Sequence, residues 1–242
     1  MNNRLWIVLG VIVVAVIGFA VAVSSGIINI SGVTKEDSSI NVEQFEYGFK
    51  NIITDQNLPT DYTKEASLVT DYVAGKADSK VVLIEWLNYQ CSACYSLSPS
   101  MREIIATYGD RVAFVQRYLR LSQGHPNGLA SSVAAEAAGR QGKFYEMGDQ
   151  LFINQPEWGV ADAASREDVF AKYAESLGLD MNRWHDDYKN YQKNGIEIRL
   201  NFQNDLAIKN GVSATPYILV SGTKVDGTKA KIIEAIDAAL AL

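Results

Sequence analysis

The pattern of apolar and polar positions divides the chain of 242 residues into three parts. Leu5–Val23 is apolar and uncharged, residues 24–60 are mostly polar, and after residue 60 apolar runs alternate with amphipathic stretches. At about 1.5 Å per residue, a 19-residue helix can cross a hydrocarbon core of about 30 Å. We therefore predict a transmembrane helix at 5–23, a tether at 24–60 and a folded domain at 61–242. Within the tether, only Val42–Ile53 has a helical pattern, and it would form a short helix packed on the domain.

Charge orients the predicted helix in the membrane. Arg4 and the terminal amine precede it, so the positive-inside rule places residues 1–4 in the cytoplasm. The domain would then lie on the extracytoplasmic side of the cell membrane, which the chain crosses once. A cleaved signal peptide is the alternative, because Ala20-Val-Ala22 resembles a cleavage site. We favour an uncleaved signal anchor, since the apolar stretch is longer than the usual core of a signal peptide.

The first part of the domain has the pattern of a strand, a helix and a second strand. Val81–Trp86 is nearly continuous in apolar character, as expected of a strand buried on both faces, although Glu85 interrupts it. Helical periodicity then continues to Gly109, with a kink expected at Pro99. Val112–Leu119 predicts the second strand. This order predicts a right-handed βαβ unit.

The second part of the domain is mostly helical. Alanine-rich stretches with a period of about 3.6 residues predict a helical insertion at about 125–195. Another helix ends near Gly211, and the chain closes with a strand at Tyr217–Val220, a second short strand and a helix at Lys229–Leu240. The helices expected inside the insertion include Lys143–Ile153, Arg166–Leu177 and Met181–Tyr191. The fold class is therefore predicted to be α/β, with a βαβ unit, a helical insertion and a ββα ending.

The only two cysteines, Cys91 and Cys94, lie between the first predicted strand and the helix that follows it. At the start of a helix, unpaired backbone N–H groups and the positive end of the helix dipole stabilise an anion. This position lowers the pKa of Cys91 and makes it the attacking thiolate, while Cys94, one turn further on, is the resolving thiol. The pair is therefore predicted to be a redox centre.

Other uses of a Cys-x-x-Cys pair fit this sequence less well. Zinc needs four ligands, and His125 and His185 lie far from the pair without the spacing of a second half-site. Covalent haem attachment needs a histidine after the second cysteine, where this chain has Tyr95. A structural disulfide across two residues closes too small a loop to stabilise the fold much. We therefore expect no metal and no cofactor.

The charge of the chain bears on its partners. Nucleic-acid binding needs clustered basic residues that neutralise phosphates. The net charge is −6, and the 22 lysines and arginines are scattered along the chain. We therefore expect no nucleic-acid partner.

Together these motifs resemble the thioredoxin fold in its DsbA-like form. The stretch Trp86-Leu-Asn-Tyr-Gln-Cys-Ser-Ala-Cys-Tyr95 is similar to that family's aromatic-rich approach to its active site, and Pro99 stands where the family's helix commonly kinks. Gly211-Val-Ser-Ala-Thr-Pro216 resembles the family's cis-proline loop. Further similarities lie in the insertion, at His125-Pro126, Gln141–Phe144 and Gly178–Met181. The resemblance implies a thioredoxin fold with a helical insertion.

The resemblance also implies how the site would hold a client protein. Pro216 would be cis and would place the backbone of Thr215 beside the cysteines, where an extended client segment can add as a strand. Tyr89 has two interpretations, which are packing around the site together with Trp86 and Tyr95, or lining the client groove. Ser92 and Ala93 would face the client between the cysteines. Pro-His stands at these two positions in the best-known oxidases of the family, so this chain is expected to be a weaker oxidant.

Glu85 has two interpretations. Relatives keep a buried acid at this place under the active site, and burial would raise its pKa so that it can exchange a proton with Cys94. The alternative is a glutamate at the end of a strand that reaches solvent.

The leading functional prediction is a membrane-anchored, extracytoplasmic thiol–disulfide oxidoreductase that forms disulfide bonds in exported proteins with cysteine pairs. The resemblance implies a quinone-linked membrane oxidase as the partner that reoxidises it. A dedicated reductase, for example of apocytochrome thiols, would run the same chemistry in reverse. A third alternative is a client-binding or chaperone-like module in which the cysteines matter little. The redox potential separates the first two, and replacement of Cys91 separates both from the third.

Overall fold

The structure is a computed structural model that describes residues 48–54, 66–121 and 124–242. The predicted transmembrane helix at 5–23 and most of the predicted tether lie outside these residues. Within the described ranges, no helix is both long enough and apolar enough to cross a membrane. All described residues belong to one compact unit, which spans Asn41–Leu242.

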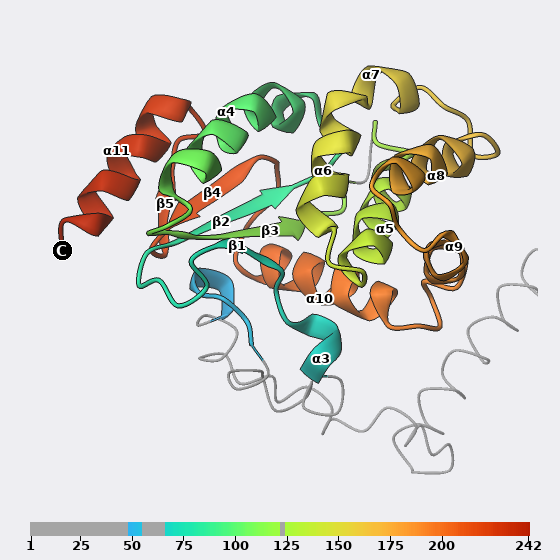
Figure 1. Cartoon of the computed structure of the whole chain (residues 1–242). Coiled ribbons are helices and arrows are strands. Elements are labelled where there is room, and N and C mark those ends of the chain that lie inside the picture. The colour runs from blue at the N-terminus through green and yellow to red at the C-terminus, as the bar shows by residue number, and fades with distance from the viewer. Residues whose placement is uncertain (1–47, 55–65, 122–123) are drawn as a thin grey trace, which may run out of the picture. The chain divides into compact units, whose positions relative to one another are not determined.

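A mixed sheet of five strands in the order β1-β3-β2-β4-β5 forms the centre of this unit (Figure 1). β2 (Val82–Leu87) and β3 (Ala113–Tyr118) are parallel, and β4 (Tyr217–Val220) pairs antiparallel with β2. The edge strands β1 (Val73–Gly75) and β5 (Thr223–Val225) are short and antiparallel to their neighbours. Every residue of β2 is buried, which confirms the prediction of a strand covered on both faces.

Helices cover both faces of the sheet. α4 (Ser92–Tyr108) and α11 (Lys229–Leu240) pack on one face, and α10 (Ile196–Lys209) lies on the other (Figure 1). The apolar cluster under the first two helices contains Leu83, Leu97, Met101, Ile104, Phe114, Ile218, Ile232 and Ile236. β2, α4 and β3 form the predicted βαβ unit, and β4, β5 and α11 form the predicted ββα ending.

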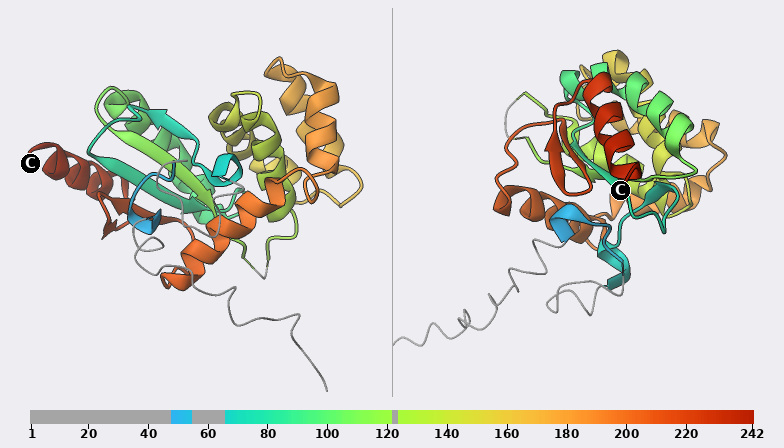
Figure 2. Two further views of the ribbon diagram at one scale, coloured as in Figure 1. Left: turned by 90° about the horizontal axis from the view of Figure 1, so that it is seen from below. Right: turned by 90° about the vertical axis from the view of Figure 1, so that its left-hand side faces the viewer.

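The helical insertion and α11 lie at opposite ends of the sheet (Figure 2). The insertion consists of α5 (Gly128–Gly139), α6 (Phe144–Ile153), α7 (Gln155–Trp158), α8 (Arg166–Ser176) and α9 (Met181–Lys189). Every residue of α5 except Leu129 is buried, because its small side chains allow α6, α8, α9 and α10 to pack close to it. The largest buried side chains of the insertion are Trp158, Phe170 and Trp184.

The predicted insertion helices are confirmed, with ends that differ by one or two residues. Three short elements were not predicted, namely α3 (Ala66–Val69), α7 and β1. Each is too short to show a hydrophobic period, and tertiary contacts therefore determine whether it forms.

Residues 48–54, at the end of the predicted tether, are packed on the domain. Residues 48–50 are helical, and the side chains of Phe49 and Ile53 are buried. The backbone of Ile53 accepts a hydrogen bond from the N–H of Asp71 at 2.9 Å. The described part of the segment Val42–Ile53 therefore packs on the domain as predicted, but its helix ends at residue 50 and not at Ile53.

Candidate active site

The two cysteines lie at the start of α4, after the turn that follows β2. Cys91 is the N-cap residue, with extended backbone angles of φ −72° and ψ 124°, and Cys94 is in the first turn. Asn88 holds this turn in place. Its side chain accepts from the N–H of Gln90 at 3.0 Å and donates to the carbonyl of Leu119 at 3.1 Å, and its carbonyl accepts from the N–H of Cys91 at 2.9 Å. These bonds tie the ends of β2 and β3 together beside the cysteines.

Both cysteines are free thiols, and their surroundings differ. Cys91 is 8% exposed and Cys94 is fully buried. A hydrogen bond with the Cys94 thiol lowers the pKa of Cys91 to about 4, helped by Thr215 and by the backbone N–H groups of Cys94 and Ala93, while burial opposes the shift. Burial raises the pKa of Cys94 well above the ordinary thiol value, and the hydrogen bond with Cys91 and the charge of Glu85 add to it. Cys91 is therefore the thiolate of the pair and Cys94 the protonated thiol.

The loop before β4 completes the site. The peptide bond between Thr215 and Pro216 is cis, as the resemblance implied. Tyr217, the first residue of β4, pairs with Trp86 of β2, and this register brings the loop beside the start of α4. The Sγ of Cys91 lies 3.5 Å from the carbonyl oxygen of Thr215, to which it donates in its protonated form, although the two residues are 124 positions apart in the sequence. The sheet therefore joins two distant segments into one site.

Glu85 lies in β2 and is only 2% exposed, so the alternative of a solvent-reaching glutamate is wrong. Its Oε2 accepts a hydrogen bond from Nε2 of Gln116 at 3.1 Å. Burial raises the pKa of Glu85 to about 7, the negative charge on Cys91 adds to this effect, and the amide of Gln116 opposes it. A buried carboxyl with a pKa near neutrality can both accept and donate a proton at physiological pH.

A cavity of about 230 Å³ reaches Glu85 from the side of α4 and α6. Met101, Ile105, Phe152 and other mostly apolar side chains line it, together with the polar group of Gln116. Arg102 and Asp149, whose charged atoms are 3.6 Å apart, also line this cavity, and both are partly exposed. The cavity is large enough for water, so it can connect the buried carboxyl with solvent.

The structure corrects one predicted client contact. Tyr89 is buried and packs against Phe152, with ring centroids 5.0 Å apart, so it does not line a client groove. The insertion covers it, which confirms the interpretation in which Tyr89 packs around the site. Ser92 and Ala93 are exposed at the start of α4, as expected. Tyr95, one residue after Cys94, is 37% exposed.

Two glutamines connect the insertion to the cysteine turn, and sequence analysis did not identify them. Nε2 of Gln155 donates to the carbonyls of Tyr89 at 2.6 Å and of Cys91 at 3.1 Å. Nε2 of Gln90 donates to the carbonyl of Gly159 at 2.8 Å, and its Oε1 accepts from the N–H of Asn127 at 2.6 Å. No sequence signal marks such residues, because their partners are backbone groups far away in the chain.

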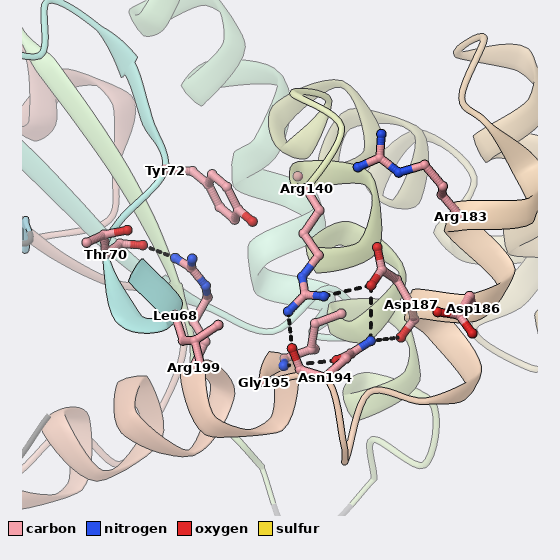
Figure 3. A pocket seen from close by; sticks show the side chains of 12 residues that line it. Leu68, Thr70, Tyr72, Arg140, Arg183, Asp186, Asp187, Asn194, Gly195 and Arg199 are labelled. Atoms are coloured by element: carbon pink, nitrogen blue, oxygen red, sulfur yellow. Dashed lines mark hydrogen bonds and ion pairs between the residues drawn. The ribbon is translucent and has the colours of Figure 1, made fainter. Parts of the chain in front are cut away.

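A second and larger cavity, of about 670 Å³, lies between the insertion and the segment around α3 (Figure 3). Three arginines line it, and internal partners engage two of them. Arg140 Nη1 lies 2.7 Å from Asp187 Oδ1, and Arg199 Nε lies 3.2 Å from Oε2 of the buried Glu136. Neither cysteine lines this cavity. Among the described residues, no group of three or more histidine, cysteine, aspartate or glutamate side chains could hold a metal ion.

Solved structures with a similar fold include two bacterial proteins. BdbD from Bacillus subtilis, in its oxidised form, shares 21% sequence identity with a TM-score of 0.60, covering 71% of this chain and 94% of that chain. The thiol-disulfide exchange protein alpha-DsbA2 from Wolbachia pipientis shares 17% identity with a TM-score of 0.61, covering 85% and 98%. These similarities establish the fold.

Similar curated sequences are named as antiporters. The Na(+)/H(+) antiporter NhaA 3 of Salinispora tropica is 34% identical over 170 residues, which cover 70% of this chain and 24% of the antiporter. The Na(+)/H(+) antiporter NhaA of Herminiimonas arsenicoxydans is 30% identical over 158 residues, which cover 65% and 23%. The chain thus spans about a quarter of the length of the curated relatives that it matches.

The family comparison agrees with the geometry. The model of a family described as thioredoxin matches residues 67–238, which include both cysteines, Glu85 and the cis-proline loop. With a thiolate and a buried thiol at the start of a helix, beside a cis-proline and above a buried acid, this chain belongs to the thioredoxin family of thiol–disulfide oxidoreductases.

Proposed function

We propose that this protein is a membrane-anchored, extracytoplasmic oxidase that introduces disulfide bonds into exported proteins. The observation that carries the proposal is the asymmetry of the cysteine pair: Cys91 is the more exposed thiol with a pKa lowered to about 4, and Cys94 is buried with a raised pKa. A stable thiolate favours the reduced form of the pair, so the disulfide readily accepts electrons. The anchor is proposed from Leu5–Val23 alone.

The first chemical step forms a mixed disulfide. A client thiolate attacks Sγ of Cys91 in the Cys91–Cys94 disulfide, the bond between the two cysteines breaks, and Cys94 leaves as a thiolate. Because the pKa of Cys94 is high, it takes up a proton, and in this proposal the carboxyl of Glu85, which carries a raised pKa and influences Cys94 electrostatically, supplies it. The cavity that reaches Glu85 allows the carboxylate to regain a proton from solvent.

The second step releases the oxidised client. Another client thiolate attacks the client sulfur of the mixed disulfide, and Cys91 leaves as the thiolate that its surroundings stabilise. The client loses two electrons and two protons in total, and the cysteine pair gains the electrons. The proposed quinone-linked membrane oxidase would then remove them.

The carbonyl of Thr215 and the exposed start of α4 are the proposed client surface. Thr215 lies beside Cys91, so an extended client segment could pair with the backbone of this loop while its cysteine reaches Sγ. Ser92 and Ala93 would contact the same segment from the helix side. Their small side chains leave Cys91 accessible to clients of different sequence.

The test is the equilibrium potential of the cysteine pair in the full-length chain, measured against glutathione. We expect a value clearly above that of thioredoxin, about −270 mV, and a higher melting temperature for the reduced form than for the oxidised form. A potential at or below the thioredoxin value would contradict the oxidase and favour the dedicated reductase. If Cys91→Ser preserved function in cells, the non-redox client-binding module would be correct instead.

A further inference from the structure

The segment of residues 48–53, here called the N-terminal clamp, packs directly behind the active site. The ring of Phe49 lies with its centroid 4.8 Å from that of Trp86 and 6.1 Å from that of Tyr217. Trp86 and Tyr217 are paired across β2 and β4, with their ring centroids 6.3 Å apart. Side chains alternate along a strand, and Leu83 of β2 faces α4, so Trp86 and the clamp lie on the opposite face of the sheet (Figure 1).

A buried ion pair fastens the clamp to the sheet. The Arg117 guanidinium donates to both carboxylate oxygens of Asp71, at 3.0 and 2.6 Å, and also to the carbonyls of Gly48 and Asn51, each at 2.8 Å. Oδ2 of Asp71 accepts from the N–H of Ile53 at 2.7 Å. Both charged side chains are buried, and such a pair is stable only when its remaining donors and acceptors are satisfied. The clamp backbone satisfies them and is therefore held at both ends.

Phe49 of the N-terminal clamp contacts one residue next to each of the two active-site loops, Trp86 and Tyr217. Trp86 precedes the turn that leads to Cys91, and Tyr217 directly follows the Thr215–Pro216 pair. The ring of Tyr217 also has the ammonium of Lys224 4.8 Å from its centroid, so Phe49, Trp86 and Lys224 surround it on several sides. The position of Tyr217 determines where the carbonyl of Thr215 lies relative to Cys91.

We propose that Phe49 is a positioning residue of the active site, which holds Tyr217 against Trp86 and thereby sets the contact between Thr215 and Cys91. This inference rests on the proposed redox function and deepens it. It places part of the segment predicted as a tether among the residues that support thiol chemistry. Without the ring of Phe49, one side of the Tyr217 ring is no longer packed. The loop that contains Thr215 can then move away from Sγ of Cys91.

The test compares two cavity-forming variants in the full-length chain, Phe49→Ala and Ile236→Ala. Ile236 is fully buried in α11 on the other face of the sheet, so its truncation destabilises the fold without touching the clamp. The readout is the pH dependence of Cys91 alkylation by iodoacetamide, whose midpoint reports the thiol pKa. We expect the midpoint to rise by up to about one pH unit in Phe49→Ala, because the Thr215 side chain, which helps to lower the pKa of Cys91, moves away from the sulfur. In Ile236→Ala the midpoint should stay at the wild-type value.

Further variants make the outcome unambiguous. Phe49→Tyr keeps the ring and should retain the wild-type midpoint, and Phe49→Leu should shift it by less than Phe49→Ala if the latter folds poorly. If the wild-type midpoint is low and neither Phe49→Ala nor Phe49→Leu changes it, the positioning role alone is overturned. An equal shift of the midpoint in Ile236→Ala would also overturn the positioning role alone. A wild-type midpoint in the ordinary thiol range would overturn the proposed function as well.

Discussion

Two buried glutamates, one in β2 near the cysteines and one in the helical insertion, have similarly raised pKa values but different neighbouring groups. Glu85 and Glu136 are each 2% exposed, and burial raises the pKa of each to about 7. Glu136 faces the guanidinium of Arg199 at 3.2 Å, whereas Glu85 has the neutral amide of Gln116 and the charge of Cys91. A raised carboxyl pKa therefore indicates burial, and the neighbouring groups determine whether the carboxyl holds a structure together or exchanges a proton.

The comparison predicts that removing Glu136 has the largest effect on stability. Glu136→Leu leaves the buried guanidinium of Arg199 without its carboxylate, which should lower the free energy of unfolding by about 3–5 kcal/mol. Denaturant unfolding measures this loss. In the double variant Glu136→Leu, Arg199→Met, most of the stability should return, because neither charge remains buried. If the single and double variants were equally unstable, the unpaired charge of Arg199 would not be the cause of the lost stability.

The pH dependence of stability should reflect both carboxyls. The pKa of each is about 7 in the folded protein against 4.5 in the unfolded chain, so the folded state binds more protons between these values. The free energy of unfolding should therefore decrease as the pH rises from about 4.5 to about 7, by up to about 3 kcal/mol for each group. Thermal unfolding of the oxidised protein across this range tests the sign. The decrease should be shallower in Glu85→Gln, and an unchanged slope would show that this carboxyl does not titrate there.

Chemistry should depend on Glu85 and not on Glu136. Glu85→Gln should slow the release of Cys94 from the disulfide by about 10-fold to 100-fold near neutral pH, because the local proton donor is lost. Stopped-flow measurement of mixed-disulfide formation with a cysteine-containing peptide detects the change. Glu136→Gln is the matched control, and its folded fraction should react at the wild-type rate. Equal slowing in the two variants would mean that neither carboxyl acts through its proton.

The smallest effect on stability is expected from the Arg102–Asp149 pair, which lines the cavity that reaches Glu85. The Arg102–Asp149 pair is partly exposed, so Arg102→Gln should change the free energy of unfolding by less than about 1 kcal/mol. This contrasts with the buried Arg199–Glu136 pair, although both pairs join an arginine to a carboxylate. Side-by-side denaturant curves check the contrast. A loss as large as that of Glu136→Leu would show that Arg102 is more strongly coupled to the core than its exposure implies.

Much of the site could be predicted from local sequence. The apolar run of β2, the helical period of α4 and the placement of Cys91 and Cys94 between them are local features, and the structure has all three. For Glu85 the sequence left two interpretations open, and the burial that the family resemblance implied is confirmed. For Tyr89 the expected packing around the site is confirmed and the groove-lining alternative is wrong, because Phe152 covers its ring.

The supporting residues show where local sequence stops being informative. Arg117 and Asp71 are charged residues that would normally be placed at the surface, yet they form a fully buried pair. Gln155 reaches the carbonyl of Cys91 from the insertion, and Phe49 reaches Trp86 from the segment predicted as a tether. Each contact joins parts of the chain that only the fold brings together.

The sequence by itself determined the order of elements and the chemistry that the protein carries, because hydrophobic periodicity and a Cys-x-x-Cys pair are encoded within a few neighbouring residues. Only the tertiary structure decided which groups surround that chemistry. It set the carbonyl of Thr215 beside Cys91, gave Glu85 the neutral amide of Gln116 and Glu136 the guanidinium of Arg199, and packed Phe49 behind both active-site loops. The physical reason is that pKa values and packing depend on distances in space, and strand pairing makes neighbours of residues more than 100 positions apart.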